Sequence, residues 1–313
     1  MSKNFWADKR VLLTGGTGFL GRHLVEKLKK KKPKKIILTD SKKDDLRIVE
    51  NCKRVVQGQD IIIHLAGIVG GIGFNRENPA TMFYDNAVMG IHLVEEARVA
   101  GVQKFVNLLT VCSYPKFALV PFREENLWDG YPEETNAPYG LAKKMLLVQG
   151  QAYYQQYGFS SIHLIPVNLY GPGDKFDPKQ SHVIPALIRK VLEAKKQGQD
   201  RLVVWGTGKA TREFLYVEDG ADGILAAAER YDKPEPVNIG SALEISISDL
   251  AKLISELANF SGKIVFDKTK PDGQPRRKLD VSKAKKEFGF EAKTDFTEGL
   301  KKTIDWYKKQ FKI

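Results

Sequence analysis

A glycine-rich segment near the start of the chain restricts the possible folds more than any other feature. Thr14-Gly15-Gly16-Thr17-Gly18-Phe19-Leu20-Gly21 follows an apolar run that ends at Leu13 and precedes apolar residues at helical spacing. A strand, a glycine turn and a helix in this order favour a nucleotide-binding unit of a parallel sheet. Gly15 permits the tight turn, Gly18 lets a pyrophosphate approach the main chain, and Gly21 allows close helix–strand packing. The N–H groups of the helix N-terminus then supply positive potential for the anion.

Apolar runs and helical patterns alternate from residue 10 to about residue 170. This order is typical of an α/β fold with a Rossmann-type, doubly wound parallel sheet. The expected strands after the first cover 35–38, 61–67, 104–109, 162–166 and 202–205, and the expected helices include 138–157 and about 183–196. We predict a dinucleotide-binding domain over 1–170 plus about 212–240, and a smaller C-terminal substrate-binding lobe over 171–211 plus about 241–313.

The length and composition of the chain are compatible with this α/β fold. With 313 residues, of which 42% are hydrophobic, the protein can bury a sizeable core. No apolar run approaches the length of a membrane span and the N-terminus lacks a signal-peptide pattern, so we expect no membrane partner. Cys52 and Cys112 lie far apart and do not form a disulfide framework, which favours a reducing, cytoplasmic setting.

The formal net charge of +12 raises the question of a nucleic-acid partner. Much of this charge lies in lysine runs such as 27–35, at a helix end before a strand, and such a run is typically a solvated face. The chain holds no nucleic-acid module, so we expect no nucleic acid as partner. A basic surface would also attract a nucleotide diphosphate.

Asp40 follows the second expected strand and bears on the choice of cofactor. An acidic residue there accepts hydrogen bonds from the ribose hydroxyls of NAD and repels the 2′-phosphate of NADP. Lys42 and Lys43 lie close by and could neutralise such a phosphate, so NAD is favoured and NADP stays open. Ala66-Gly67, at the end of the third strand, is expected to line the cofactor.

Tyr139 and Lys143 lie four residues apart, which is about one helical turn, so their side chains share a face. A neighbouring cation is expected to lower the pKa of the tyrosine, which can then exchange a proton with an oxygen that becomes a carbonyl. Thr110 follows the strand over 104–109, at the edge where open sheets place reacting groups. Its hydroxyl can bind the same substrate oxygen. A surface Tyr–Lys pair and a turn threonine are the alternatives.

The spacing Gly-x-x-Gly-x-x-Gly together with Tyr-x-x-x-Lys resembles the short-chain dehydrogenase/reductase superfamily. Further segments, nearly from end to end, resemble one extended branch of it, the GDP-L-fucose synthase family. They are Val69-Gly70-Gly71-Ile72, Cys112-Ser113-Tyr114-Pro115-Lys116, Ala137-Pro138-Tyr139-Gly140-Leu141-Ala142-Lys143, Asn168-Leu169-Tyr170-Gly171-Pro172-Gly173-Asp174, Ser181-His182-Val183-Ile184-Pro185-Ala186-Leu187, Val204-Trp205-Gly206-Thr207-Gly208, Arg212-Glu213-Phe214-Leu215 and Lys270-Pro271-Asp272-Gly273-Gln274-Pro275-Arg276.

Members of that family epimerise C3 and C5 of a GDP-linked 4-keto-6-deoxy sugar and reduce C4. The resemblance implies Tyr139 and Lys143 as the catalytic pair, Thr110 in place of the family's usual serine, and Cys112 and His182 as base and acid of the epimerisation. A 4-keto group acidifies the protons at C3 and C5, so a thiolate can remove one and an imidazolium can return one to the other face. A buried structural cysteine and a helix-capping histidine are the alternatives.

The motifs and the resemblance together imply the following contacts and partners. The cofactor contacts are Gly15, Thr17, Gly18, Phe19, Leu20, Gly21, Asp40, Leu46, Leu65, Ala66, Gly67, Tyr139, Lys143 and His182. The substrate contacts are Cys112, Asn168, Lys190, Trp205, Arg212 and Arg276. No metal is implied. The partners are a nucleotide-diphosphate sugar with GDP as the nucleotide, and a second copy of the chain bound through helices near 86–100 and 138–157.

The chain departs from the family pattern at two further positions. Lys190 stands where an arginine is common, which weakens the expectation of a bidentate phosphate contact. Asp40 stands where reductive members tend to carry a basic residue for NADP, and this leaves the net reaction open. The alternative is a redox-neutral, NAD-dependent epimerase that acts at C4 or at C3 and C5 of a GDP- or UDP-sugar. A catalytically idle nucleotide-sugar-binding protein is a third reading, which the complete set of Thr110, Tyr139 and Lys143 disfavours.

Overall fold

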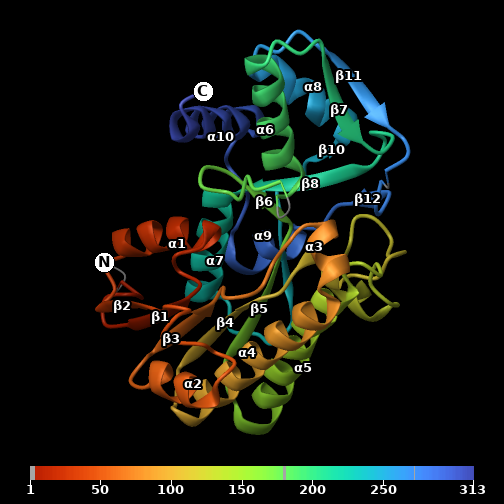
Figure 1. Cartoon of the computed structure of the whole chain (residues 1–313). Coiled ribbons are helices and arrows are strands. Elements are labelled where there is room, and N and C mark those ends of the chain that lie inside the picture. The colour runs from red at the N-terminus through yellow and green to blue at the C-terminus, as the bar shows by residue number, and fades with distance from the viewer. Residues whose placement is uncertain (1–3, 179–180, 271) are drawn as a thin grey trace.

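The computed structural model describes residues 4–178, 181–270 and 272–313 (Figure 1). Its main sheet has parallel strands in the order β2–β1–β3–β4–β5–β9. They are β1 (Arg10–Thr14), β2 (Lys35–Leu38), β3 (Ile61–His64), β4 (Lys104–Leu108), β5 (Ser161–Pro166) and β9 (Val237–Ile239). The expected Rossmann-type α/β fold is confirmed, although β3 ends at His64 and not at Gly67.

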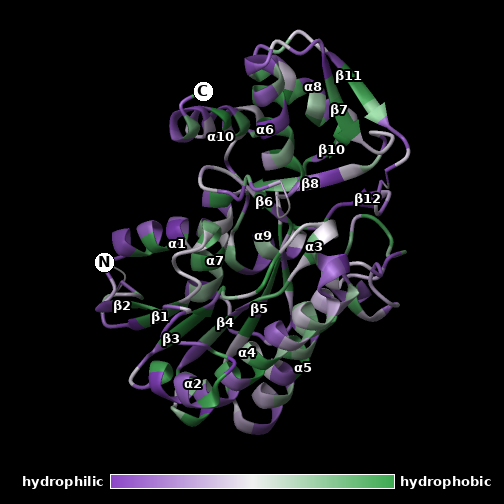
Figure 2. Ribbon diagram, viewed as in Figure 1, coloured by the Kyte–Doolittle hydropathy of each residue, from purple (hydrophilic) through white to green (hydrophobic). Residues whose placement is uncertain are grey.

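Helices cover both faces of the main sheet. One face carries α1 (Phe19–Lys30), α7 (Val217–Arg230) and α9 (Ser282–Phe288), and the other carries α2 (Val49–Val56), α4 (Pro79–Val99) and α5 (Ala137–Tyr157). Successive side chains of a strand point to opposite faces, so Val11 and Leu13 enter the core with α1, whereas Leu12 enters the core with α2 and α4. Figure 2 shows hydrophobic residues concentrated in these strands, as a sheet buried on both faces requires.

A second set of elements builds a separate core. The strands β6 (Asn168–Tyr170), β8 (Thr211–Tyr216), β10 (Glu244–Ser246) and β12 (Arg276–Arg277) form one sheet, and β7 (Arg201–Trp205) pairs with β11 (Lys263–Asp267). The helices α6 (Val183–Lys196), α8 (Ile247–Leu257) and α10 (Phe296–Phe311) pack on these strands. Short helices are α3 (Ile72–Glu77), η1 (Val111–Ser113) and η2 (Glu124–Trp128).

The path of the chain between the two cores differs in detail from the expected one. Residues 212–216, which the sequence places in the dinucleotide-binding domain, lie in β8 of the second sheet, and the chain returns to the main sheet with α7 and β9. The sequence places 282–288 in the smaller lobe, but α9 contacts α7 and β9. The domain boundaries themselves stay a prediction.

Two further findings concern membrane-spanning helices and the state of the two cysteines. Among the residues that the structure describes, no helix has both the length and the apolar character needed to cross a bilayer. Cys52 and Cys112 are both free thiols, the first buried and the second partly exposed.

Candidate active site

The turn after β1 lies where the strand order of the main sheet reverses. β2 lies on one side of β1 and β3 on the other. Open α/β sheets bind ligands outside the carboxyl ends of the strands at such a point. Gly15 has a φ of 69°, and a Cβ added there would lie 2.8 Å from the amide nitrogen of Ala66. Glycine is therefore required both by the turn and by its close approach to the segment after β3.

The N-terminus of α1 fits the diphosphate of a dinucleotide. The helix follows the N-cap residue Gly18, no side chain caps it, and its first turn holds no acidic residue. A Cβ on Gly21 would overlap the carbonyl oxygen of Gly15, so the helix packs directly on the turn. The free N–H groups and the helix dipole favour an anion at this place. The other expected cofactor contacts of this segment, Thr17, Phe19 and Leu20, lie in the turn and the first helical turn.

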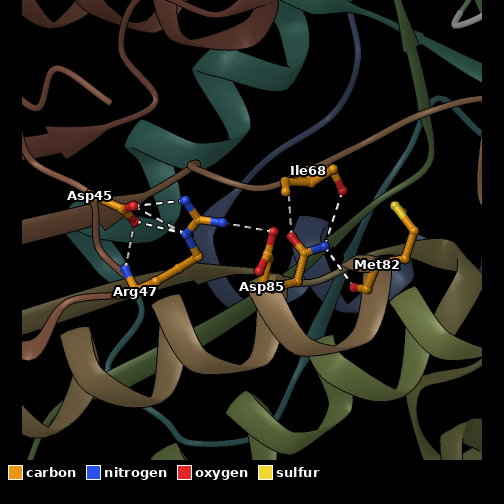
Figure 3. Close-up of polar contacts among 6 residues, drawn as sticks. Asp45, Arg47, Ile68, Met82 and Asp85 are labelled. Carbon is orange, nitrogen blue, oxygen red and sulfur yellow. Dashed lines mark hydrogen bonds and ion pairs between the residues drawn. The ribbon is translucent and has the colours of Figure 1, made fainter. Parts of the chain in front are cut away.

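The loop after β2 holds Asp40 at the next strand end. Asp40 is exposed, and its carboxylate accepts the amide N–H of Lys42 at 2.9 Å. Arg47 of the same loop forms an ion pair with Asp85 of α4 at 3.2 Å, which fixes the loop to that helix (Figure 3). The carboxylate of Asp40 thus lies where dinucleotide folds hold the adenosine ribose. Leu46 is only 3% exposed and belongs to the core, so its side chain has almost no free surface.

Asn86 of α4 fixes the segment after β3. Its Oδ1 accepts the N–H of Ile68 at 3.0 Å, and its Nδ2 donates to the carbonyl oxygens of Ile68 at 3.1 Å and Met82 at 2.8 Å (Figure 3). A Cβ on Gly67 would lie 2.9 Å from Asn86 Oδ1 and 3.8 Å from Lys143 Nζ. The main chain of Leu65, Ala66 and Gly67 therefore runs from the Gly15 turn to Lys143. Asn86 has no part in the motifs, so sequence reasoning missed it.

A close contact between α5 and η1 positions Tyr139. A Cβ on Gly140 would overlap the carbonyl oxygen of Cys112, and Ser113 Oγ donates to the carbonyl oxygen of Gly140 at 3.0 Å. This packing brings the Tyr139 phenol beside the hydroxyl of Thr110. Thr110 also caps η1, because its hydroxyl accepts the N–H of Cys112 at 3.2 Å. The same side chain therefore stabilises the turn and lies beside Tyr139.

The expectation that Lys143 lowers the pKa of Tyr139 is wrong. Burial raises the pKa of Tyr139 well above its ordinary value, the nearby Cys112 adds to the rise, and the Thr110 hydroxyl opposes it. Burial also lowers the pKa of Lys143 to about 8. Loss of water is the largest cause for both side chains, and it shifts each of them toward its neutral form.

Cys112 and His182 both interact with Arg277 of β12. Nη1 of Arg277 lies 3.7 Å from Sγ of the half-buried Cys112, in a donor geometry. His182 is the N-cap residue of α6. Desolvation, and after it the charges of Lys175 and Arg277, lower the pKa of His182. Arg277 thus contacts the side chain that the resemblance implies as base and acts electrostatically on the one that it implies as acid.

The sequence names Arg276 and misses Arg277, its neighbour. Arg277 is 9% exposed and contacts Cys112, whereas the exposed Arg276 forms an ion pair with Glu244 at 2.8 Å. The alternation of side chains along a strand predicts that only one of two adjacent arginines enters the site. The sequence shows no alternating pattern that is long enough to tell which one.

The remaining expected substrate contacts lie in two places. Arg212 is aligned with Arg277 in the pairing of β8 and β12, and burial and the charge of Arg277 lower the pKa of Arg212 to about 10. Lys190 and Trp205 line an open groove of about 760 Å³ between α6 and β7, and the Lys190 ammonium lies 5.2 Å from the centre of the Trp205 ring. Asn168 is half-buried at the start of β6.

Comparisons with known proteins agree on one group of enzymes. Residues 11–240 match the model of the NAD dependent epimerase/dehydratase family. A GDP-L-fucose synthase of Sinorhizobium fredii is 40% identical over 299 residues, which are 95% of each chain. GDP-L-fucose synthase 1 of Arabidopsis thaliana is 39% identical, covering 96% of this chain and 93% of that one. The crystal structure of a GDP-L-fucose synthetase from Naegleria fowleri bound to NADP is similar with a TM-score of 0.88 and 32% identity, covering 98% of this chain and 94% of that one.

Proposed function

The chain belongs to the NAD dependent epimerase/dehydratase family and, within it, to the GDP-L-fucose synthases, and on this premise we propose that it epimerises C3 and C5 and reduces C4 of a GDP-4-keto-6-deoxy sugar. It is an NAD(P)-dependent nucleotide-sugar epimerase/reductase, and the proposed product is GDP-L-fucose or a close relative. The position of Cys112 beside Tyr139 and Thr110 supports the proposal most. A thiol suited to carbon-acid chemistry lies next to hydroxyls that can bind the keto oxygen.

We assign chemical roles to five side chains of the site. The Cys112 thiolate removes a proton from a carbon beside the keto group, while the hydroxyls of Thr110 and Tyr139 donate hydrogen bonds to the oxygen that gains negative charge. His182 returns a proton to the opposite face. When bound, the nicotinamide supplies the hydride that reduces C4. Tyr139 gives its proton to the C4 oxygen, and Lys143 stabilises the phenolate that remains.

The cationic residues of the second sheet suit the diphosphate of the substrate. Arg212 is half-buried, and in the described part of the chain it donates to two main-chain carbonyl oxygens, from Nη1 to Thr211 at 2.7 Å and from Nη2 to Asp272 at 3.3 Å. A planar guanidinium can give two parallel hydrogen bonds to a phosphate. We place the guanine in the groove of Lys190 and Trp205, because Trp205 is 63% exposed and its ring offers a stacking surface. Asn168 and Arg276 stay proposed contacts.

Mass spectrometry of GDP-4-keto-6-deoxymannose incubated with the protein in deuterated water tests the reaction. The expected product is reduced at C4 and carries solvent deuterium at C3 and C5. Cys112→Ser and His182→Asn should each abolish this incorporation, whereas direct reduction of the 4-keto group persists. If neither exchange nor reduction occurs with either cofactor, the proposed substrate is wrong. Unchanged exchange in both variants would remove Cys112 and His182 from the mechanism.

Asp40 favours NAD and, with it, the redox-neutral epimerase as second candidate. Its exposed carboxylate at the end of β2 would repel a 2′-phosphate. We expect the KM for NADH to be about tenfold below that for NADPH, and Asp40→Ala to narrow this gap through loss of the like-charge repulsion. A wild-type protein that uses NADPH better would refute the preference. Turnover of intact GDP- or UDP-sugars with NAD alone would favour the second candidate.

Two further proposals concern the assembly and its compartment. A homodimer is supported by large apolar side chains exposed on α4 and α5, namely Phe83, Tyr84, Val99, Met145, Val148, Tyr154 and Tyr157. Two free cysteines support a reducing, cytoplasmic setting.

A further inference from the structure

Arg277 is a buried cation that the structure aims at the sulfur of Cys112. Nη1 of its guanidinium lies 3.7 Å from Sγ, and only 9% of the residue is exposed. Gln274 Oε1 accepts from Nε at 3.2 Å and from Nη2 at 3.0 Å. Gln274 is itself 7% exposed and donates to the carbonyl oxygen of Lys116 at 2.9 Å. Two of the three guanidinium nitrogens are therefore fixed, and the third faces the thiol.

Within residues 4–178, 181–270 and 272–313, no carboxylate forms an ion pair with Arg277, although the charge of Glu133 interacts with it. A buried guanidinium without a carboxylate is costly, because desolvation is not repaid by an opposite charge. An anion at the Cys112 sulfur would supply that charge.

The other titratable and charged groups around Cys112 carry both signs. Arg212 interacts electrostatically with Cys112, with Arg277 and with the carboxylates of Asp272 and Glu133. Tyr139, on α5, also interacts with Cys112. His182, at the start of α6, interacts with Arg277. Glu133 is the one carboxylate among these neighbours that acts on both arginines.

We propose that Arg277 is a positioning residue that holds the Cys112 sulfur as a thiolate, oriented for proton abstraction beside the keto group. In that step the thiolate accepts the carbon-bound proton and becomes a thiol, while the electron pair of the broken C–H bond moves onto the substrate oxygen. Arg277 keeps its own protons throughout, because a guanidinium does not deprotonate in a protein. The inference rests on the proposed role of Cys112.

Alkylation of the purified protein by iodoacetamide, followed by peptide mass spectrometry across a pH series, measures the thiolate directly. The reagent is uncharged, so removal of a cation does not change its attraction to the site. Cys52 is fully buried and serves as an internal unreactive thiol. No substrate or cofactor is needed, so a phosphate-binding role of Arg277 cannot contribute to the result.

Arg277→Gln should slow alkylation of Cys112 about tenfold at neutral pH, with the rate recovered at high pH where the thiol ionises unaided. Arg277→Lys keeps a cation and should restore most of the rate. Gln274→Met, which removes the acceptor but keeps the volume, should slow alkylation to a smaller extent. The matched control is Arg276→Gln, which removes the adjacent exposed cation and should leave the alkylation rate unchanged.

Alkylation of Arg277→Gln at the wild-type rate over the whole pH series overturns the proposal, as does an equal loss in Arg276→Gln. Circular dichroism and a thermal melt establish that each variant is folded. In the deuterium assay, Arg277→Gln should lower kcat for exchange more than it raises KM. A shifted alkylation profile without any turnover by the wild type would retain the positioning role and reject the proposed substrate. Turnover by the wild type together with an alkylation profile that Arg277→Gln leaves unshifted would support the proposed substrate and reject the positioning role of Arg277.

Discussion

At the scale of single residues, burial acts on Tyr139 and Lys143 in opposite senses. It raises the pKa of the phenol and lowers the pKa of the ammonium to about 8. A phenol that keeps its proton is the form that can protonate the C4 oxygen during reduction. The shift that contradicts the sequence-based expectation therefore still suits a proton donor. It could not be predicted from Tyr-x-x-x-Lys spacing, because spacing gives the distance between two groups and not the water that each loses.

Tyr139→Phe should lower the rate of 4-keto reduction about 10²- to 10⁴-fold, because only the proton donor is removed. Binding of the cofactor, followed by its fluorescence, should change little. Tyr154→Phe on the same helix is the control, since Tyr154 is 43% exposed and the change keeps the ring. A Tyr139→Phe variant within a few-fold of the wild-type rate would exclude the phenol as proton donor.

Asp174 predicts a pH dependence of stability. Burial raises its pKa to about 7, while the N–H and the charge of Lys175 act in the opposite direction. Its Oδ2 has no hydrogen-bond partner in the described part of the chain. An unfolded aspartate has a pKa of about 3.9, so between about pH 4 and pH 7 the native state binds more protons and the free energy of unfolding falls as pH rises.

Asp174→Asn keeps the shape and removes this titration. Relative to the variant, the wild type should lose about 2–4 kcal/mol of unfolding free energy between pH 4 and pH 7 and little more above pH 7. Urea unfolding at pH 4, 5.5, 7 and 8 measures the difference. If the free energies of unfolding of the two proteins depend on pH in the same way, the prediction is wrong and the Asp174 carboxylate is paired in the native state.

At the scale of elements, Glu213 of β8 joins three separate segments. One carboxylate oxygen accepts the N–H groups of Ser241 at 2.6 Å and Ala242 at 2.8 Å, and the other accepts the N–H of Leu279 at 2.7 Å. Glu213 is fully buried, and Ala242 has a φ of 63°, so the carboxylate holds the loop after β9 in a conformation that alanine seldom adopts. The short strands of the second sheet depend on this link.

Glu213→Ala should lower the free energy of unfolding by about 3–5 kcal/mol, because three N–H groups, of which that of Leu279 is buried, lose their carboxylate acceptor. Glu134→Ala is the control, since the exposed Glu134 forms a surface ion pair with Lys116 and its loss should change stability far less. Urea unfolding followed by tryptophan fluorescence measures both. Equal losses in the two variants would show that the link contributes nothing beyond a surface charge.

The elements differ in how far the sequence predicts them. β2 and α6 begin and end where the apolar runs place them, because each pattern is complete within its own segment. The pairing of β12 with β8 joins residues 276–277 to 211–212, and a strand of two residues has no pattern of its own. Arg277 enters the site through that pairing, which is why the sequence points to the motif but not to the correct arginine.

At the scale of the whole molecule, the residues of the proposed active site come from both cores. Thr110, Cys112 and Tyr139 lie at the end of β4 and on α5 of the main sheet, whereas Arg212 and Arg277 belong to the second sheet. The site is complete only when the two sheets are in place. The family model ends at residue 240 and does not reach Arg277.

The proposed homodimer predicts a change of mass at this scale. Met145 and Val148 are 39% and 50% exposed on α5, and Met145→Lys with Val148→Lys should place charges in the interface and halve the mass found by sedimentation equilibrium. Val265→Lys on β11 is the control, because Val265 is 45% exposed away from these helices and its variant should keep the dimer mass. A monomeric mass for the wild-type protein would refute the proposed homodimer.

The composition of the main core has a consequence for synthesis of the chain on the ribosome. That core contains Trp6 as well as Phe288 and Phe290. The ribosome therefore adds the last of these residues long after the first has entered the exit tunnel. Until α9 emerges, the apolar faces of the early strands lack part of their cover and stay exposed to other nascent chains. The main core therefore cannot be completed before α9 has left the tunnel, and truncated translation products that lack α9 should aggregate where the full-length chain does not.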